Sequence, residues 1–167
     1  MLKQNKGITM ISLVVTVIVL MILASITTYS GVSTARESRY YNAVQQMKIM
    51  QSEVNSWYEN KKDGDESNWN KGVLLSSSGK ETKCFTAYNS AKNNNLNGTD
   101  IGQIADFKYF SKDVIKNELD IEGISYDFII NLNTRSVILV DGIEKDEKIY
   151  YSLGEIEGEQ YNVDYIE

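Results

Sequence analysis

The feature that most constrains this chain is a charge-free stretch from residue 8 to residue 35, close behind two lysines and a glycine. About twenty helical residues span roughly 30 Å, the thickness of the hydrocarbon core of a bilayer. Eleven Leu, Ile and Val residues lie between Ile11 and Ile26. Each contributes roughly −0.3 to −0.6 kcal/mol to insertion at a helix centre, so the sum is around −3 to −6 kcal/mol. The sequence therefore predicts a membrane-spanning helix over residues 8–30.

The flanking charges indicate an orientation. Lys3 and Lys6 precede the apolar stretch, whereas Arg36 and Arg39 follow it only after a gap. Positive charge is retained on the cytoplasmic side, so we expect a cytoplasmic leader and everything after about Gly31 outside the cell.

Three interpretations of this start are open. A cleaved secretory signal has an apolar region of about 7–15 residues and small residues at its cleavage site. Here the apolar run is longer, and residues 23–27 (LASIT) make a poor cleavage site. An uncleaved signal anchor is the second interpretation. The third depends on the glycine that directly precedes the apolar helix.

The segment Lys6-Gly7-Ile8-Thr9 combines a basic leader, a glycine and a β-branched apolar helix. This start resembles that of type IV pilins and type II secretion pseudopilins, strongly over residues 3–30 and more loosely afterwards. The resemblance implies that a prepilin peptidase cuts after Gly7 and methylates the new amino group of Ile8. Lys6, Gly7 and Ile8 would then be the processing residues.

The resemblance also implies a structural subunit and not an enzyme, with no catalytic residue and no required cofactor. The helix would first anchor the subunit in the bilayer and then pack against other subunits in a pilus or pseudopilus. Further partners would be the peptidase and an assembly platform in the inner membrane. The expected location is a single-pass cell membrane protein with its C-terminal domain outside, and then a surface filament. The expected assembly residues are Ile8, Ser12, Leu13, Val17, Leu20 and Leu23.

Some features depart from the family pattern. Most pilins carry a glutamate shortly after the cut, thought to pair with the amine of a neighbouring subunit, but this chain has Ser12. We therefore expect a minor or tip subunit in preference to a major one. The chain has no proline, so a straight helix is expected, with Gly31 as its weak point. It has a single cysteine, and the absence of a disulfide fits a Gram-positive relative.

The remaining pattern predicts an α+β fold, with a long N-terminal helix packed on a small antiparallel sheet. Helical spacing continues to Asn60, where one apolar face recurs. That face consists of Tyr40, Val44, Met47, Met50, Val54 and Trp57. The expected organisation is a leader (1–7), a transmembrane and assembly helix (8–30), an amphipathic helix (31–60) and a globular domain (61–167).

In the last third of the chain, alternation predicts strands over residues 125–132, 136–140 and 149–153, with a turn at 133–135. Tyr126, Phe128, Ile130 and Leu132 would share one side of the first strand. In the middle, residues 84–88 are expected to form a short strand. Apolar residues from Ile104 to Leu119 suggest a helix.

Three lysines, Lys108, Lys112 and Lys116, would form a stripe along that helix. Such a stripe is either a solvated face or a contact with an acidic segment of a neighbouring subunit or with DNA. Trp57 and Trp69 are expected to serve as a helix–sheet contact and a loop anchor.

Composition narrows the function classes. The net charge is −6, so no general attraction to nucleic acid is expected. Histidine is absent, and no glycine pattern of a phosphate-binding loop occurs, so no enzyme is expected. Cys84 is interpreted as a buried small residue, with a reactive thiol as the alternative.

Four acidic residues, Asp141, Glu144, Asp146 and Glu147, lie within seven positions. They are interpreted as a solvated hairpin loop, and calcium is the alternative because hard cations prefer several oxygen ligands. The competing class of function is an uncleaved, signal-anchored surface protein. Its outer domain would bind a ligand through the Asn-rich segment around residues 89–97.

Overall fold

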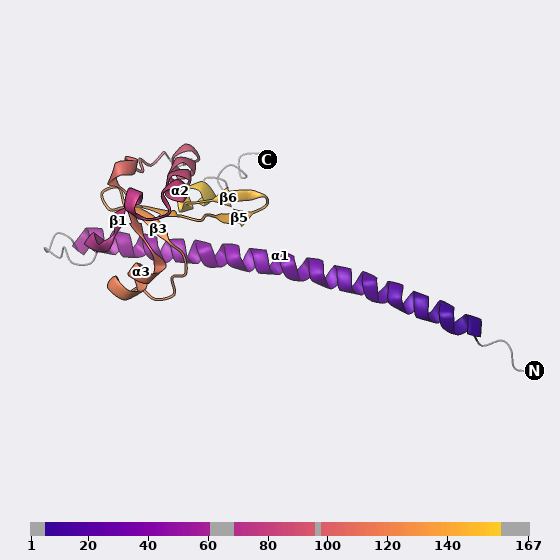
Figure 1. The fold of residues 1–167 in the computed structure, drawn as a ribbon. Coiled ribbons are helices and arrows are strands. Elements are labelled where there is room, and N and C mark those ends of the chain that lie inside the picture. Colours follow the sequence, from indigo (N-terminus) through magenta and orange to yellow (C-terminus); the bar gives the residue numbers. More distant parts are fainter. Residues whose placement is uncertain (1–5, 61–68, 96–97, 158–167) are drawn as a thin grey trace, which may run out of the picture. The chain divides into compact units, whose positions relative to one another are not determined.

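A computed structural model describes residues 6–60, 69–95 and 98–157; within its first helix, the side chains of residues 6–11 and 24–31 lie outside the description (Figure 1). The chain divides into two compact units, residues 1–38 and 39–167. The elements, in chain order, are α1 (Lys6–Asn60), η2 (Trp69–Lys71), β1 (Val73–Leu74), η3 (Leu75–Ser77), α2 (Glu81–Asn93), η4 (Ile104–Asp106), β2 (Lys108–Phe110), α3 (Lys112–Glu118), β3 (Phe128–Asn131), β4 (Ser136–Leu139), β5 (Ile143–Lys145) and β6 (Lys148–Tyr150). The predicted α+β class, with a helix packed on an antiparallel sheet, is confirmed.

The helix α1 contributes residues to both units. It runs for 55 residues, through the position of Gly31. Among the described residues, no helix combines the length and the apolar character needed to cross a membrane. The predicted transmembrane segment is thus not confirmed. Parts of that segment, the side chains of residues 8–11 and 24–30, lie outside the described residues, as does the leader up to residue 5.

The second unit is built on a four-stranded antiparallel sheet in the order β1-β2-β3-β4. The central strands are held in register by Tyr109 opposite Ile129 and by Ile129 opposite Ile138. All four residues of β3 are buried. An antiparallel strand with one solvated face alternates buried and exposed positions, so uniform burial means that both faces of this strand are covered.

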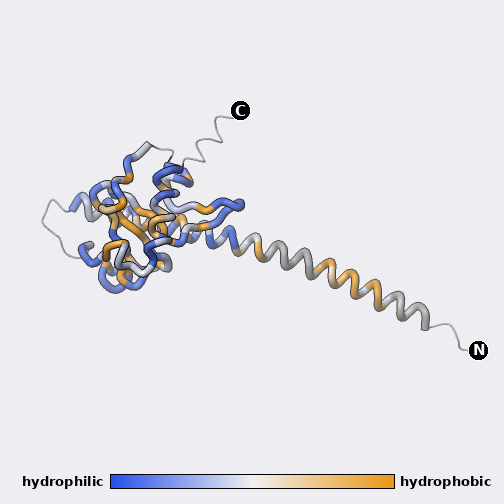
Figure 2. The backbone as a smooth tube through the Cα atoms, turned by 45° about the horizontal axis from the view of Figure 1, so that its top comes forward, coloured by the Kyte–Doolittle hydropathy of each residue, from blue (hydrophilic) through white to orange (hydrophobic). Residues whose placement is uncertain are grey.

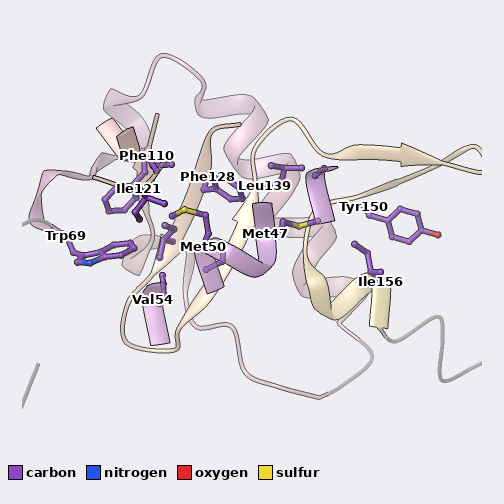
Figure 3. Close-up of a cluster of buried hydrophobic side chains, with 14 of the residues drawn as sticks. Met47, Met50, Val54, Trp69, Phe110, Ile121, Phe128, Leu139, Tyr150 and Ile156 are labelled. Atoms are coloured by element: carbon purple, nitrogen blue, oxygen red, sulfur yellow. The ribbon is translucent and has the colours of Figure 1, made fainter. Parts of the chain in front are cut away.

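The α1 side of the sheet carries the larger core (Figure 3). Met47, Met50 and Val54 are fully buried there, together with Phe110 and Phe128. The apolar face predicted for the second half of α1 is therefore confirmed. Tyr126 and Leu132 are partly buried against the same core, so the predicted shared side of the strand is confirmed too.

Aromatic rings close one end of this core. The ring centroids of Trp69 and Phe110 lie 5.7 Å apart, and those of Trp57 and Trp69 lie 6.3 Å apart. The packing roles predicted for both tryptophans are confirmed. Trp57 joins α1 to the core, and Trp69 anchors the segment that follows residues 61–68, which lie outside the description.

The opposite face of the sheet is covered by α2, and here the sequence-based prediction is wrong. Residues 84–88 were expected to form a strand, but they lie within a 13-residue helix. Its buried residues are Cys84, Ala87, Tyr88 and Ala91. Their spacings of three, one and three place them on one helical face. They meet Ile129 and Ile138 from the sheet in a second core.

The helix expected between Ile104 and Leu119 is correct only in its second half. Residues 108–110 form β2, which pairs with β3, and the helix α3 begins at Lys112. Ser111 caps this helix, because its hydroxyl accepts a hydrogen bond from the Val114 backbone N–H at 3.2 Å. Lys108 therefore lies on a strand, and the three lysines do not form a stripe on one helix.

The predicted third strand is shorter than expected and belongs to a different sheet. β6 pairs with β5 in a separate two-stranded sheet. Asp146 and Glu147 form its tight turn, with φ values of +51° and +65°. Two consecutive residues with positive φ are typical of a type I′ turn, which matches the twist of the flanking strands.

Candidate functional sites

The first candidate site is the apolar surface of α1 in the first unit, between Leu13 and Leu23 (Figure 2). The exposed fraction of the large apolar side chains there ranges from 43% at Val17 to 65% at Leu13, Leu20 and Met21. The large apolar residues exposed in this segment are Leu13, Val14, Val15, Val17, Ile18, Val19, Leu20, Met21, Ile22 and Leu23. They occupy every side of the helix. A helix that is apolar all round is suited to apolar surroundings, in a protein core or a membrane.

The polar groups within this surface are few and small. The Thr16 hydroxyl donates a hydrogen bond to the Leu13 carbonyl oxygen at 2.8 Å, so its polar group is satisfied within the helix. Ser12 is exposed at the amino-terminal edge of the segment. The expected assembly residues Ser12, Leu13, Val17, Leu20 and Leu23 thus all lie on the exposed surface, while the side chain of Ile8 lies outside the description.

The expected processing residues lie at the start of α1. The helix begins at Lys6, so the peptide bond between Gly7 and Ile8 falls in its first turn. The side chains of Lys6 and Ile8 lie outside the described residues, and the processing prediction stays a prediction.

The acidic residues considered for calcium are spread over the β5–β6 hairpin and the segment before it. The Asp141 carboxylate pairs with the Lys83 ammonium at 2.5 Å. Glu144 lies on β5 opposite Ile149, and Asp146 and Glu147 form the turn. Within the described residues, no group of three or more His, Cys, Asp or Glu side chains could hold a metal ion. The geometry gives calcium no support.

The sequence analysis did not single out Asp127, a buried residue at the centre of an ionic cluster. Its carboxylate accepts hydrogen bonds from the Lys80 ammonium, from the Tyr109 hydroxyl at 2.7 Å and from the Lys112 backbone N–H at 2.8 Å. It therefore joins the residue before α2, the strand β2 and the start of α3. The sequence signal that could have identified Asp127 is its position directly before an apolar strand.

Opposing effects set the ionisation of this cluster. Burial alone would raise the pKa of Asp127, but the hydrogen bonds from Lys80, Lys112 and Tyr109 together lower it below its ordinary value. The hydrogen bond to Asp127 raises the pKa of Lys80. Burial, followed by the hydrogen bond to Asp127, raises the pKa of Tyr109 far above its ordinary value. The cluster is an ionised carboxylate held by a cation and a neutral phenol, an arrangement suited to holding elements together.

Cys84 is fully buried in the core between α2 and the sheet. Burial raises the pKa of its thiol, and a hydrogen bond with Ser78 opposes that shift. A raised pKa lowers the thiolate fraction at neutral pH, and the thiolate is the reactive form. The interpretation as a buried small residue is favoured over a reactive thiol.

Comparison of the chain with protein-family models, with curated proteins and with solved structures found no match.

Proposed function

We propose that this chain is a structural subunit of a type IV pilus or a pseudopilus, processed between Gly7 and Ile8. The observation that carries the proposal is the exposed apolar surface from Leu13 to Leu23, directly behind a basic leader that ends in glycine. The same helix continues into a face that is buried on a sheet. The resemblance to pilins rests on the sequence, in which a basic leader and Gly7 precede the apolar helix.

In this proposal the apolar segment has two successive roles. It first holds the subunit in the bilayer, where lipid surrounds its apolar side chains. After cleavage it packs against the same segment of other subunits, so that neighbouring helices replace the lipid. The second unit is then displayed outside the membrane at the surface of the filament.

Ser12 favours a minor or tip subunit within this proposal. A serine hydroxyl carries no charge, so it cannot form the ion pair with the amine of a neighbouring subunit that the family's glutamate is thought to provide. The change Ser12→Glu is expected to raise the share of the protein recovered in sheared filaments. Unchanged incorporation would contradict the assignment to a minor position.

The experiment that tests the proposal replaces Gly7, with Asn5→Glu as a control that adds the same charge elsewhere in the leader. Gly7→Glu is expected to leave the leader attached and to prevent assembly, because bulk and charge would stand at the cleaved bond. Asn5→Glu is expected to be cleaved as the natural chain is. Mature filaments from the Gly7→Glu chain would contradict the proposal.

A second candidate is a signal-anchored surface protein that keeps its leader. One observation favours it: a pocket of about 380 Å³ in the second unit has Asn95, from the Asn-rich segment, in its wall. This candidate predicts that Gly7→Glu and Asn5→Glu behave alike, because an anchor needs no glycine before its helix.

A further inference from the structure

The outer edge of β4 contains backbone groups that face a pocket. β4 is the last strand of its sheet and pairs only with β3 among the described strands. In antiparallel pairing, the N–H and C=O groups of alternate residues point to the same side. The Leu139 N–H points away from β3, since it donates to the Tyr151 carbonyl oxygen at 2.7 Å. The N–H and C=O of Val137, two residues earlier, therefore point away from β3 as well.

The outward groups of Val137 have no hydrogen-bond partner among the described residues, although Val137 is only 6% exposed. On either side of it the edge is engaged. The Gln51 side chain donates to the Arg135 carbonyl oxygen at 2.8 Å, and Tyr151 accepts from the Leu139 N–H. Buried backbone groups in proteins are nearly always hydrogen-bonded, because an unpaired one costs free energy. The N–H and C=O of Val137 are therefore suited to pair with a bound molecule.

The pocket of about 380 Å³ lies beside Val137, and its wall on the α1 side supplies hydrogen-bond donors. Gln51 donates to the Asn55 side-chain oxygen at 3.3 Å, which leaves the Asn55 NH₂ group without an acceptor among the described residues. The Arg135 guanidinium lies over the Tyr58 ring, 5.1 Å from its centroid, and forms no ion pair with a described carboxylate. This wall is thus suited to acidic side chains, whose oxygens accept hydrogen bonds.

The wall on the α2 side is more apolar. It contains Ala91, Ile101 and Ile138, which belong to the core between α2 and the sheet, beside the polar Asn95. The pocket therefore extends between the two helices that cover opposite faces of the sheet. A strand added to β4 would have one face towards each helix, because successive side chains of a strand point to opposite faces.

A capping motif explains why the chain itself leaves this edge after Tyr151. Glu155 accepts hydrogen bonds from the Tyr151 N–H and from the Ser152 N–H at 3.1 Å, while the Ser152 hydroxyl accepts from the Glu155 N–H at 3.3 Å. This reciprocal pattern is a capping box, which starts a helical turn. The Ser90 hydroxyl on α2 donates to the same buried carboxylate at 2.8 Å. The described chain thus turns away before it reaches Val137.

We propose that the edge of β4 binds an extended peptide of a partner protein that alternates acidic and apolar side chains. Its backbone pairs with the N–H and C=O of Val137, the donor and acceptor pair that one residue of an added strand complements. Its acidic side chains lie towards Asn55 and Arg135, and its apolar side chains lie towards Ala91 and Ile138. The site lies within the second unit, so the inference goes beyond the proposed function and holds for an assembled subunit and for a signal-anchored protein alike.

A basic peptide is the competing occupant, because Glu157 also lines the pocket and is exposed. The position of Arg135 over Tyr58 and the donors of α1 favour the acidic peptide. The charge of the peptide is therefore varied in the test.

Backbone amide exchange of the full chain in an uncharged detergent tests the proposal, with Val137 as the reporter. The probe is the blocked pentapeptide Glu-Val-Glu-Val-Glu, in which either direction of binding presents one acidic and one apolar face. We expect saturating probe to slow exchange of the Val137 amide at least about threefold, the factor for a site two-thirds occupied. The Leu139 amide, bonded to Tyr151, is the internal control and is expected to keep its rate.

Two control peptides separate backbone pairing from other binding. The same pentapeptide methylated at every backbone nitrogen keeps its side chains but cannot donate to Val137, and it is expected to leave the rate unchanged. Lys-Val-Lys-Val-Lys is expected to slow exchange much less than the acidic probe. Equal slowing by either control would overturn the proposal.

A pair of neighbouring variants on α1 locates the site. Asn55→Tyr places a ring in the pocket and is expected to abolish the slowing, whereas Ser56→Tyr, at an exposed residue outside the lining, is expected to retain it. Slowing that persists in Asn55→Tyr would overturn the proposal. A Val137 amide as protected as that of Leu139 without probe would overturn it too, because the chain or a second copy would then occupy the edge.

Discussion

Along α1, the large apolar side chains between Leu13 and Leu23 are exposed, whereas one apolar face between Tyr40 and Val54 is buried on the sheet. Both segments are helical, and both contain Ile, Val and Met. They differ in pattern, because the second segment has one apolar face and otherwise mostly polar positions, and the first is apolar on every side. In the proposed function, the second segment is buried within the chain, whereas the first is buried by lipid and then by other subunits. That difference is the physical basis of the proposed anchoring and assembly.

The largest effect is expected from a charge in the buried segment. Met50 is fully buried, so Met50→Asp would place an unpaired carboxylate in the core and lower the free energy of unfolding by more than about 4 kcal/mol. Ile49 is 40% exposed, and Ile49→Asp is expected to lower the free energy of unfolding by about 1 kcal/mol or less. Denaturant unfolding followed by tryptophan fluorescence measures both. Equal losses would show that this face of α1 is not packed as described.

The same substitution in the exposed segment is expected to act on membrane association instead. On an insertion scale, replacing Val by Asp at a helix centre costs about 3 kcal/mol, roughly a hundredfold in partitioning. Val17→Asp should therefore move the chain out of the membrane fraction of cells, with Val17→Leu as the control. Unfolding of the second unit should not change. If Val17→Asp and Val17→Leu were recovered equally in the membrane fraction, the proposed difference in surroundings between the two segments of α1 would be contradicted.

A smaller effect is expected at Asp127, which stabilises the second unit only. Asp127→Asn retains the shape of the side chain but loses the charge that Lys80 and Tyr109 face. We expect the free energy of unfolding to fall by about 2 kcal/mol, the size of a charge-assisted hydrogen bond. Asp113→Asn, at a carboxylate in the first turn of α3, is the control and is expected to have a smaller effect. Equal losses would contradict the role given to Asp127.

The pH dependence of stability should reflect the same cluster. The folded-state pKa of Asp127 is lowered. Its contribution to the free energy of unfolding is therefore present above the unfolded-state pKa of about 3.9 and is lost as pH falls through the folded-state pKa. The folded-state pKa of Tyr109 is raised. Its contribution to the free energy of unfolding is therefore present below the unfolded-state pKa of about 10 and is lost as pH rises towards the folded-state pKa. Thermal unfolding from pH 2 to 7 should show a shallower acid decline in Asp127→Asn. Identical acid declines would contradict this account.

The smallest effect is expected at Gly31, which lies between the two segments of α1. Glycine within a helix is roughly 1 kcal/mol less favourable than alanine. Gly31→Ala should therefore stabilise α1 by about that amount without altering the core contacts of Met47 and Met50. Circular dichroism on heating measures the gain. A loss of helix would mean that the residue is needed in another backbone conformation.

Helical periodicity was sufficient to predict α1 as one helix and its buried face, because spacings of three and four persist from Tyr40 to Trp57 without proline or glycine. Alternation of apolar residues likewise predicted that Phe128 and Ile130 lie on the same side of β3. The turn between β3 and β4 was predicted correctly as well, and Arg135 there has a φ of +59°.

The failures have physical causes. The buried face of α2 follows helical spacing, at Cys84, Ala87, Tyr88 and Ala91. Two of these residues are alanines and polar residues surround them, so the helical pattern of apolar residues is weak. β2 is only three residues long, and its Phe110 continues the helical spacing of α3, so strand pairing overrode a local signal.

Contacts between residues far apart in the chain could not be predicted from any local sequence pattern. The partners of Asp127 lie 15, 18 and 47 positions away in the chain. Ser152 and Glu155 exchange hydrogen bonds in a capping box, which was visible as S-x-x-E, but the hydrogen bond from the Leu139 N–H to the Tyr151 carbonyl oxygen beside it had no local signal.

The most direct test of the central claim is the intact mass and amino-terminal sequence of the chain extracted from the membranes of its native host. We predict a chain that begins at Ile8 and is heavier by one methyl group than the bare sequence from that residue. A chain that keeps the leader would contradict processing as a pilin-like subunit and favour a signal-anchored surface protein. A chain that begins near Ser25 would contradict both, because the exposed apolar segment of α1 would have been removed.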